Sequence, residues 1–442
     1  MPCGLPGESQ VGLFPVIHRR QPEETVARSP GRRLDRRSTR SRICFEQACQ
    51  ADPSKRRLHN GMECFLAELK NQHFVPKVHL RAFSDANDGE KRMINLIHIS
   101  SGRAISRASI SDQCAKHYFY GKDLHLERAL SDLEGTYAEV IRDVEAGARS
   151  GISLRFLRDW TFLQYQRTDA ARRRSKELHA QMDAAIGDSN WKVDTSDKAL
   201  VALAIQMFTE TVGAIEDLKT VIIVNKTDTD FITSDEPAII FNKWLHQKQN
   251  LDTFGLGNSG LCIYMPLTPR FGVLSYDSNV YDMSKQKDSV TLNDRKEIAL
   301  LNALLMRSDA KNVYFQNWAD RDKLMADIKT EVSYRTGGTR TNLLVPVDGR
   351  PGTFRPIAKD EDQLDFPTAV IHTETVFPRP SNWFRFLKNK MRPVFFENGT
   401  SVGRVRQKRW LEVLPGFEQS QPSIPARAQV LLPGLPRRPA LG

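Results

Sequence analysis

The stretch at residues 72–83, which reads QHFVPKVHLRAF, is the densest run of apolar, aromatic and imidazole side chains near the start of the chain. Its proline suits the first turn of a helix, where a missing N–H costs nothing, so a short helix is predicted with Leu80 and Phe83 on one face. His73 then lies just upstream of that helix. The alternating run at 93–99 predicts a strand, so the fold begins with both helix and β structure.

The rest of the folded chain is predicted to contain a run of helices followed by a run of short strands. Apolar residues at steps of three and four predict helices, and short β-rich runs between turn residues predict strands. The predicted helices span 123–147, 153 to beyond 182, 195–218 and 294–306, and the predicted strands span 221–224, 231–233, 238–241, 261–265, 271–276 and 312–315. This order predicts an α+β fold in a single domain at 62–377, with a helix-rich N-terminal half packed on a small, mostly antiparallel sheet.

The two ends of the chain carry its excess positive charge. The net charge is +11, of which residues 1–60 contribute +6 and residues 379–442 contribute +9, so that residues 61–378 carry −4. Both ends lack a periodic apolar pattern, which predicts a disordered Arg-rich arm at 1–61 and a disordered basic tail, rich in Pro and Arg, at 378–442. The arm is either a phosphate-binding tail or an extension ahead of an alternative start at Met62. Nucleic acid is expected as a partner only through these ends or as a substrate.

Composition also bears on location and on cysteine chemistry. The longest apolar runs are far shorter than the roughly 20 residues that cross a bilayer, so no transmembrane helix and no membrane partner are expected. The N-terminal residues lack the pattern of a secretory signal, which predicts a cytoplasmic protein. The closest cysteines, Cys44 and Cys49, do not have the CxxC spacing of a zinc or redox site, so the cysteines are expected to be free thiols.

Four motifs in a fixed order resemble a known bacterial family. They are QHFVPKVHLRAF, HLERALSDLE, QYQRT at 164–168, and FITSDEP followed by YMPLTP. Together they are similar to the domain of unknown function 4238 family. The resemblance covers about residues 70–316, leaves both ends outside, and departs from the family at 77–79, where relatives tend to have a more aromatic run. The family name implies no activity, so the chemistry has to be argued from the residues.

The polar side chains of these motifs form a candidate site if their segments converge. His73 and Glu127 are predicted as ligands of a divalent metal, Glu134 and Asp235 as catalytic groups, and Gln164 and Arg167 as substrate contacts. An imidazole, three carboxylates and an arginine suit metal-dependent hydrolysis of an anionic substrate, as in a nuclease or phosphodiesterase. The chain contains no HExxH motif, no paired Asp-x-Asp and no Glu-x-Lys nuclease pattern.

Each of these residues also has a structural explanation. Arg167 could pair with Glu127 or Glu134 between two helices, since breaking a buried ion pair costs about 3 to 5 kcal/mol. Asp235 could cap the SDEP turn, and His73 could bond the backbone. The alternative function is therefore a non-enzymatic binding or interaction protein in which the polar residues form a buried network. The run of arginines at 172–174 is interpreted most simply as a solvated helix face.

Overall fold

The opening stretch forms a short strand followed by a short helix. Strand β1 (Asn71–His73) precedes helix α3 (Lys77–Ala82), and the proline of the stretch occupies the N-cap position of that helix. Leu80 and Phe83 are both fully buried, as their shared face predicts. His73 lies at the end of β1, just upstream of the helix, where the sequence places it.

The computed structural model describes residues 70–412 and 429–430, apart from the short gaps at 86, 123, 187–193, 284–287, 337, 348–353, 358–369, 398–403 and 413–428. The predicted Arg-rich arm at 1–61 lies outside the described residues, as do residues 431–442 of the predicted tail. The described thiols, Cys114 and Cys262, are both free and buried.

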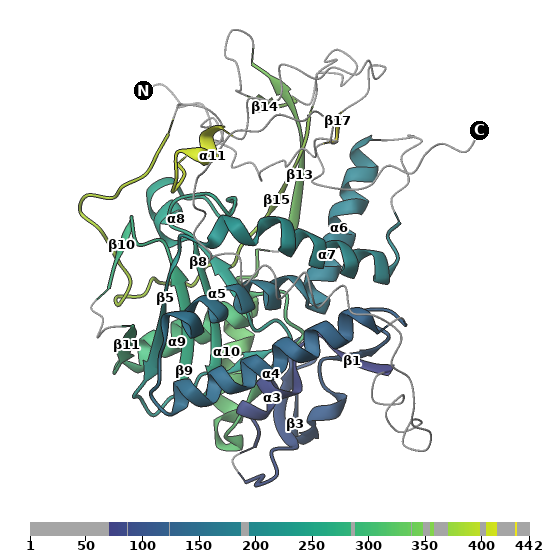
Figure 1. Cartoon of the computed structure of the whole chain (residues 1–442), viewed down its shortest axis with the longest axis vertical. Helices are drawn as coiled ribbons and strands as arrows, with labels where there is room; N and C mark the ends of the chain where they lie inside the picture. Colours follow the sequence, from purple (N-terminus) through teal and green to yellow (C-terminus); the bar gives the residue numbers. More distant parts are fainter. Residues whose placement is uncertain are drawn as a thin grey trace, which may run out of the picture.

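The largest sheet has five strands, and most of its pairs are antiparallel. Its order is β11 (Ser289–Leu292), β5 (Lys219–Asn225), β9 (Phe271–Tyr276), β8 (Cys262–Thr268) and β7 (Ile239–Phe241). Only the pair of β11 with β5 is parallel within this sheet. Its strands are almost continuously apolar and buried, because helix α5 lies across β5, β8 and β9 and contacts all three (Figure 1).

A second sheet joins the two strands that follow the opening stretch to segments from much later in the chain. Its order is β3 (Arg103–Ser109), β2 (Met93–His98), β12 (Asn312–Phe315) and β6 (Thr233–Ser234), and all its pairs are antiparallel. A separate ribbon pairs β1 with β4 (Ala115–His117). The predicted α+β class and the mostly antiparallel pairing are therefore confirmed, although the strands form several small sheets rather than one.

The helices of the N-terminal half agree with the apolar periodicity except at one point. They are α4 (His125–Glu145), α5 (Gly151–Gln166), α6 (Asp169–Ile186) and α7 (Asp197–Thr211). The prediction of one continuous helix from 153 beyond 182 is wrong, because the chain breaks after α5. Arg167 caps the C-terminus of α5, and the Thr168 hydroxyl accepts the N–H of Ala171 to start α6. The break changes the direction in which Arg167 projects.

The chain beyond the predicted boundary at 377 packs against the core over much of its length. The remaining α-helices and strands are α8 (Lys243–Gln249), β10 (Tyr281–Asp282), α9 (Arg295–Arg307), α10 (Arg321–Val332), β13 (Thr339–Pro346), β14 (Phe354–Pro356), β15 (Val370–Thr375), β16 (Lys388–Asn389), α11 (Arg409–Glu412) and β17 (Gln429–Val430). Strands β13 and β15 lie beside α6 (Figure 1). Phe384, Leu387 and Val405 are buried, and Lys243 Nζ donates to the Phe384 carbonyl at 2.8 Å. The segment from 378 to 412 therefore includes parts of the folded core.

Arg406 is the strongest tie between this segment and the core. Its guanidinium is completely buried and donates to the backbone carbonyls of Ala214, Leu256 and Asn258 at 2.5 to 2.9 Å. It also forms a two-nitrogen ion pair with Asp217 at 2.9 and 3.1 Å. One arginine thus satisfies three carbonyls and one carboxylate that come from two separate loops.

One described segment, residues 197–215, is long and apolar enough by composition to cross a membrane. It consists of α7 and the short 3-10 helix that follows it, Val212–Ile215. A core helix of a soluble fold passes the same test, and α7 packs its buried residues against α5 and α6. This finding alone is weak support for a membrane span.

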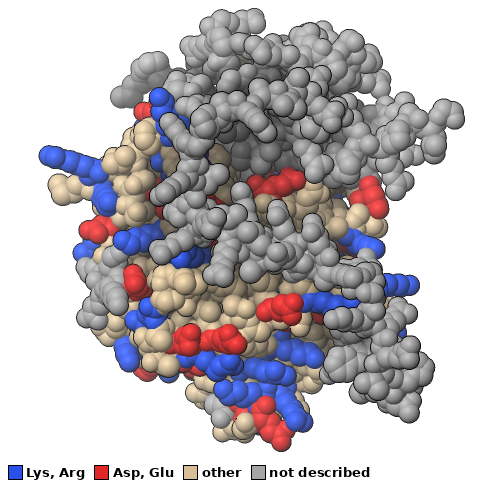
Figure 2. Space-filling model, in the orientation of Figure 1, with Lys and Arg blue, Asp and Glu red and all other residues tan. Residues whose placement is uncertain are grey.

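Charged side chains of both signs are interspersed over the described part of the face drawn in Figure 2. Lysine and arginine side chains alternate there with aspartate and glutamate, and apolar or neutral surface separates them. This face therefore does not present one large positive field, which agrees with the small negative net charge of the central residues.

Candidate functional site

Arg167 links three elements at the centre of the candidate site. Its Nη2 donates to Glu134 Oε1 on α4 at 2.6 Å and to the backbone carbonyl of His73 on β1 at 3.1 Å. The guanidinium also lies over the rings of Tyr120 and Trp160, with its central carbon 5.7 and 5.5 Å from the ring centres. The Arg167 side chain is completely buried, whereas that of Glu134 is 27% exposed. The predicted pairing of Arg167 with a carboxylate of α4 is therefore present.

Gln164 and His73 both bond the backbone next to this pair. Gln164 Nε2 donates to the Phe74 carbonyl at 2.8 Å, and His73 Nε2 donates to the Ser111 carbonyl at 3.2 Å. Burial, together with the positive charge of Lys77, lowers the pKa of His73 to about 4. The imidazole is therefore neutral at neutral pH, and one of its nitrogens is already engaged by the backbone.

Several polar atoms of the site are buried and have no hydrogen-bond partner among the described residues. They are Oε1 of Gln164 and two nitrogens of Arg167, Nε and Nη1. Buried polar atoms of native proteins nearly always have a partner, and an exception needs a specific explanation. The site therefore holds both donor and acceptor capacity that the surrounding fold does not use.

Glu127 lies in the first turn of α4 and faces the same site. Burial raises the pKa of Glu127 to about 7, and the negative charge of Glu134 adds to that shift. The positive charges of Arg167 and Lys77 act in the opposite direction. Glu127 and Glu134 are seven residues apart, so they lie on the same face of the helix, and Leu130 is buried between them. A pKa of about 7 places the titration of Glu127 near neutral pH.

Asp235 lies at a different place and contacts none of the other predicted site residues. Its Oδ1 accepts the backbone N–H groups of Lys311 and Asn312 at 2.8 and 2.9 Å, at the start of β12. Burial raises the pKa of Asp235, although those two donors act against the shift. The Asp235 carboxylate therefore joins the SDEP turn to β12 and does not cap its own turn. Ser234 caps that turn, because its hydroxyl accepts the N–H of Glu236.

The site includes a buried histidine that the sequence analysis did not single out. His79 lies on α3, is 1% exposed, and is bonded through Nδ1 to the Tyr137 hydroxyl at 2.9 Å and through Nε2 to the Thr233 hydroxyl at 2.7 Å. Burial lowers its pKa to about 3, so the imidazole is neutral. The signal available in the sequence was its position four residues before Phe83, which places it on the buried face of α3.

The predicted metal ligands can be compared with the observed geometry. Among the residues that the structure describes, no three His, Cys, Asp or Glu side chains come together in a way that could hold a metal ion. His73 and Glu127 do face the same region, because Lys77 and Arg167 act on the pKa of both. The carboxylates of α4 and Arg167 are therefore the part of the candidate site that is best assembled.

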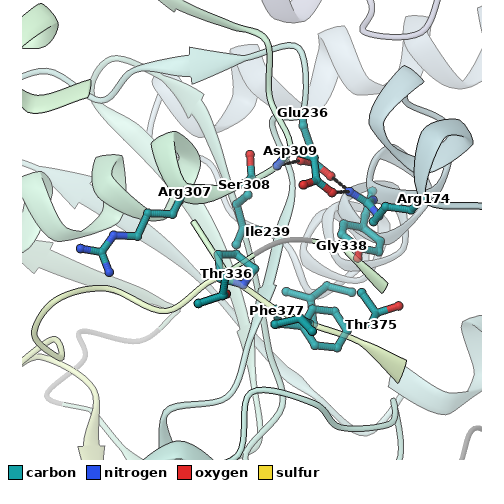
Figure 3. A pocket seen from close by; sticks show the side chains of 14 residues that line it. Arg174, Glu236, Ile239, Arg307, Ser308, Asp309, Thr336, Gly338, Thr375 and Phe377 are labelled. Atoms are coloured by element: carbon teal, nitrogen blue, oxygen red, sulfur yellow. Dashed lines mark hydrogen bonds and ion pairs between the residues drawn. The ribbon is translucent and has the colours of Figure 1, made fainter. Parts of the chain in front are cut away.

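A polar cavity lies between α6, the SDEP turn and the C-terminal segment. Its volume is about 30 Å³, which is room for only one or two water molecules. The Glu236 and Asp309 carboxylates turn toward Arg174 and pair with it, whereas the guanidinium of Arg307 points away from them (Figure 3). The interpretation of the arginines at 172–174 as a solvated face is wrong for Arg172 and Arg174, whose side chains are only 11% and 13% exposed.

The raised pKa of Glu127 gives a testable pH dependence of stability. Because its folded pKa, about 7, is above the ordinary value of 4.5, its contribution to stability is present below pH 4.5 and is lost as pH rises through 7. Between pH 5 and pH 8 the wild type is expected to lose about 2 kcal/mol more unfolding free energy than Glu127→Gln, after discounting for partial exposure. Urea unfolding of both proteins at the two pH values measures the difference. If the unfolding free energies of the two proteins changed equally between the two pH values, the raised pKa of Glu127 would be contradicted.

Comparison with known proteins gives one match. The family model described as "Protein of unknown function (DUF4238)" matches residues 71–318, which is more than half of the chain. No curated protein and no solved structure matches the chain. The matched residues contain every predicted site residue and end just after β12, so the packed C-terminal segment lies outside the match.

Proposed function

Since this chain belongs to the family of proteins of unknown function DUF4238, we propose that it is a hydrolase of phosphate esters whose acid–base groups are Glu127 and Glu134. The observation that carries the proposal is the arrangement of two partly buried carboxylates on one face of α4, one of them paired with a buried arginine that retains unused N–H groups. Pairs of carboxylates in unlike environments are the usual basis of acid–base catalysis near neutral pH.

Glu127 suits the role of proton donor. A group whose pKa is about 7 is protonated about half the time at neutral pH, so it can both give and take a proton. Glu134 uses Oε1 for its ion pair with Arg167, so its second oxygen is the proton acceptor that we assign to the attacking water. In this scheme the water oxygen bonds to phosphorus while the bond from phosphorus to the leaving oxygen breaks. Glu134 takes the water proton and Glu127 protonates the leaving oxygen.

Arg167 and Gln164 are assigned as positioning residues. Both are only 1% exposed, so they lie under the carboxylates rather than at the surface. Arg167 fixes Glu134 against β1, and Gln164 fixes the Phe74 carbonyl at the start of the next turn. The predicted divalent metal at His73 and Glu127 is a separate version of the proposal, because a neutral imidazole and a carboxylate are suitable ligands. In that version Glu127 binds the metal as a carboxylate and does not donate the proton.

A non-enzymatic buried network is the second candidate. It is favoured by the contacts of Arg167, His73 and Gln164, which all bond backbone carbonyls of the fold. In that case Glu127 serves only to border the apolar stripe of α4. The two candidates predict different effects of replacing Glu127. If Glu127 is catalytic, the replacement lowers the rate of hydrolysis. If Glu127 is only structural, the replacement changes stability, and there is no hydrolysis to measure.

The test is hydrolysis of bis(4-nitrophenyl) phosphate and of single-stranded DNA by the full chain. Glu127→Gln is expected to lower kcat/KM by about 100-fold or more, since a positioned general acid contributes that much. Glu134→Gln is expected to cause a similar loss. Glu139→Gln, a change at an exposed residue of the same helix, is the matched control and should keep the wild-type rate.

Two results would overturn the proposal. The first is a wild-type protein that hydrolyses neither substrate with Mn²⁺, with Mg²⁺ or with a chelator. The second is a Glu127→Gln protein that is as active as the wild type. Loss of activity in the chelator, and its return with Mn²⁺, would support the metal part of the proposal.

A further inference from the structure

Four cationic side chains converge on one buried carboxylate at the start of α6. Oδ1 of Asp169 accepts from Lys116 Nζ at 2.5 Å and from Arg172 Nε at 2.8 Å. Its Oδ2 accepts from Arg173 Nη1 at 2.6 Å and lies 3.5 Å from Lys311 Nζ. These four cations, Lys116, Arg172, Arg173 and Lys311, are called the basic cluster below.

Exposure separates the Asp169 carboxylate from three of the four cations, because Arg172 is itself only 11% exposed. The Asp169 side chain is 4% exposed, whereas those of Lys116 and Lys311 are 40% and 53% exposed. Arg173 is intermediate, at 28%. The carboxylate therefore lies beneath a group of cations, and the two ammonium groups remain accessible from solvent.

The basic cluster keeps an excess of positive charge. Asp169 supplies one negative charge, and the exposed Asp197 supplies a second through its pair with Arg172 at 2.5 Å. The buried carboxylate of Asp235 also acts on Arg173, and its Oδ1 accepts the backbone N–H of Lys311. Asp309 accepts from Arg173 through its backbone carbonyl, while its carboxylate pairs with Arg174. At least one positive charge of the four therefore remains unbalanced.

The charge state of the buried acid is fixed at neutral pH. Burial alone raises the pKa of Asp169, but the hydrogen bonds from Lys116 and Arg172 outweigh it and hold the pKa well below the ordinary value. Asp169 is therefore ionised across the neutral range, and the excess charge of the cluster does not vary with pH there.

The basic cluster borders the carboxylate site. The pairing of β1 with β4 places Lys116 opposite Gln72, next to the pair of His73 with Ala115. Asp169 begins α6 two residues after Arg167, the residue that links β1 to α4. A ligand held at the cluster would therefore lie near β1, the strand that Arg167 links to α4, and α4 carries both acid–base groups.

We propose that the basic cluster binds a phosphate group of the substrate, with Lys116, Lys311 and Arg173 as its contacts. The inference rests on the proposed function for its role in hydrolysis, but the binding site stands on its own geometry. The excess of positive charge suits an anionic phosphate ester, and exposed ammonium groups together with a guanidinium are side chains that bind phosphate. The phosphate belongs either to a nucleic acid backbone or to a small phosphorylated compound.

Direct binding to the full chain tests the proposal. The probes are inorganic pyrophosphate, measured by calorimetry, and a short fluorescent oligothymidylate, measured by anisotropy. The double variant Lys116→Ala/Lys311→Ala is expected to bind the probe of the correct source about tenfold more weakly, because each lost phosphate contact removes a charge pair. Lys116→Arg/Lys311→Arg keeps the charge and should keep the affinity.

The controls separate the cluster from other cations of the chain. The basic ends are identical in all variants, so they cannot cause a difference between them. Lys323→Ala removes an exposed lysine of α10 that pairs only within its own helix, with Asp327, and should bind like the wild type. Weaker binding of pyrophosphate indicates a small phosphorylated compound, and weaker binding of the oligothymidylate with unchanged pyrophosphate binding indicates a nucleic acid.

The proposal is overturned if the wild type binds neither probe, or if the double variant binds both as tightly as the wild type. Failure of the proposed hydrolysis has a different signature. In that case Glu127→Gln and the wild type both bind phosphate through the cluster, and neither hydrolyses the ester.

Discussion

Replacing Arg167 with methionine is expected to lower the free energy of unfolding by about 3 to 5 kcal/mol, the usual loss when one partner of a buried ion pair is removed. The change deletes the bonds to Glu134 and to the His73 carbonyl, which together hold α4 and β1 against the end of α5. Methionine keeps most of the volume between the Tyr120 and Trp160 rings, so the loss reports the polar contacts rather than a cavity. Urea unfolding followed by far-UV circular dichroism measures it.

The control for this prediction is Arg128→Met, at an exposed position of α4. Exposed substitutions away from special features change stability by about 0.5 kcal/mol or less. If the Arg167 and Arg128 variants were equally stable, the guanidinium of Arg167 would not be the link between β1 and α4. A second replacement, Arg167→Lys, should recover only part of the loss, because a single ammonium cannot reproduce the planar fork.

Replacing Arg406 with methionine is also expected to lower the free energy of unfolding by about 3 to 5 kcal/mol, because it removes one partner of a buried ion pair. The change leaves the carbonyls of Ala214, Leu256 and Asn258 and the carboxylate of Asp217 without their shared donor. Because Arg406 lies outside the family match, the result also tests whether the matched residues depend on the segment that follows them. Thermal and urea unfolding give the difference.

Lys408→Met serves as the neighbouring control, since that residue is exposed and lies two positions further along. Limited proteolysis supplies a second readout. The Arg406 variant should be cut in the C-terminal segment at a protease concentration that leaves the Lys408 variant intact. Equal protection of the two variants would show that Arg406 does not hold the segment in place.

Local periodicity explains why much of the fold could be predicted. The apolar stripe of α4 and the β-rich runs of β5, β8 and β9 depend only on neighbouring residues, so the sequence contains their signal. The break between α5 and α6 has no such signal, because the residues around Arg167 include no glycine or proline. Thr168 follows Arg167, the residue that caps α5, and the Thr168 hydroxyl accepts the N–H of Ala171 at the start of α6. This bond depends on how the hydroxyl is oriented in the folded protein.

The candidate site was predictable only in part, because some of its residues are placed by contacts between segments far apart in the chain. Glu134 and Arg167 were brought together by helix pairing, and their charges and spacing already suggested it. Asp235 was placed with them on chemical type alone, but the pairing of β6 with β12 directs it to the N–H groups of Lys311 and Asn312. Which strands pair depends on segments almost 80 residues apart, and no local pattern encodes that choice.

The position of Arg406 has a consequence for how the protein is made. Its bonds reach residues synthesised 148 to 192 positions earlier in the chain. Translation proceeds at about 5 to 20 residues per second, so the ribosome needs roughly 10 to 40 s to progress from Ala214 to Arg406. The five-stranded sheet, residues 219–292, is synthesised within that interval and before the side chain that bonds its loops. The bonds of Arg406 therefore form after the sheet has been made, and chaperones and proteases can act on the nascent chain before then.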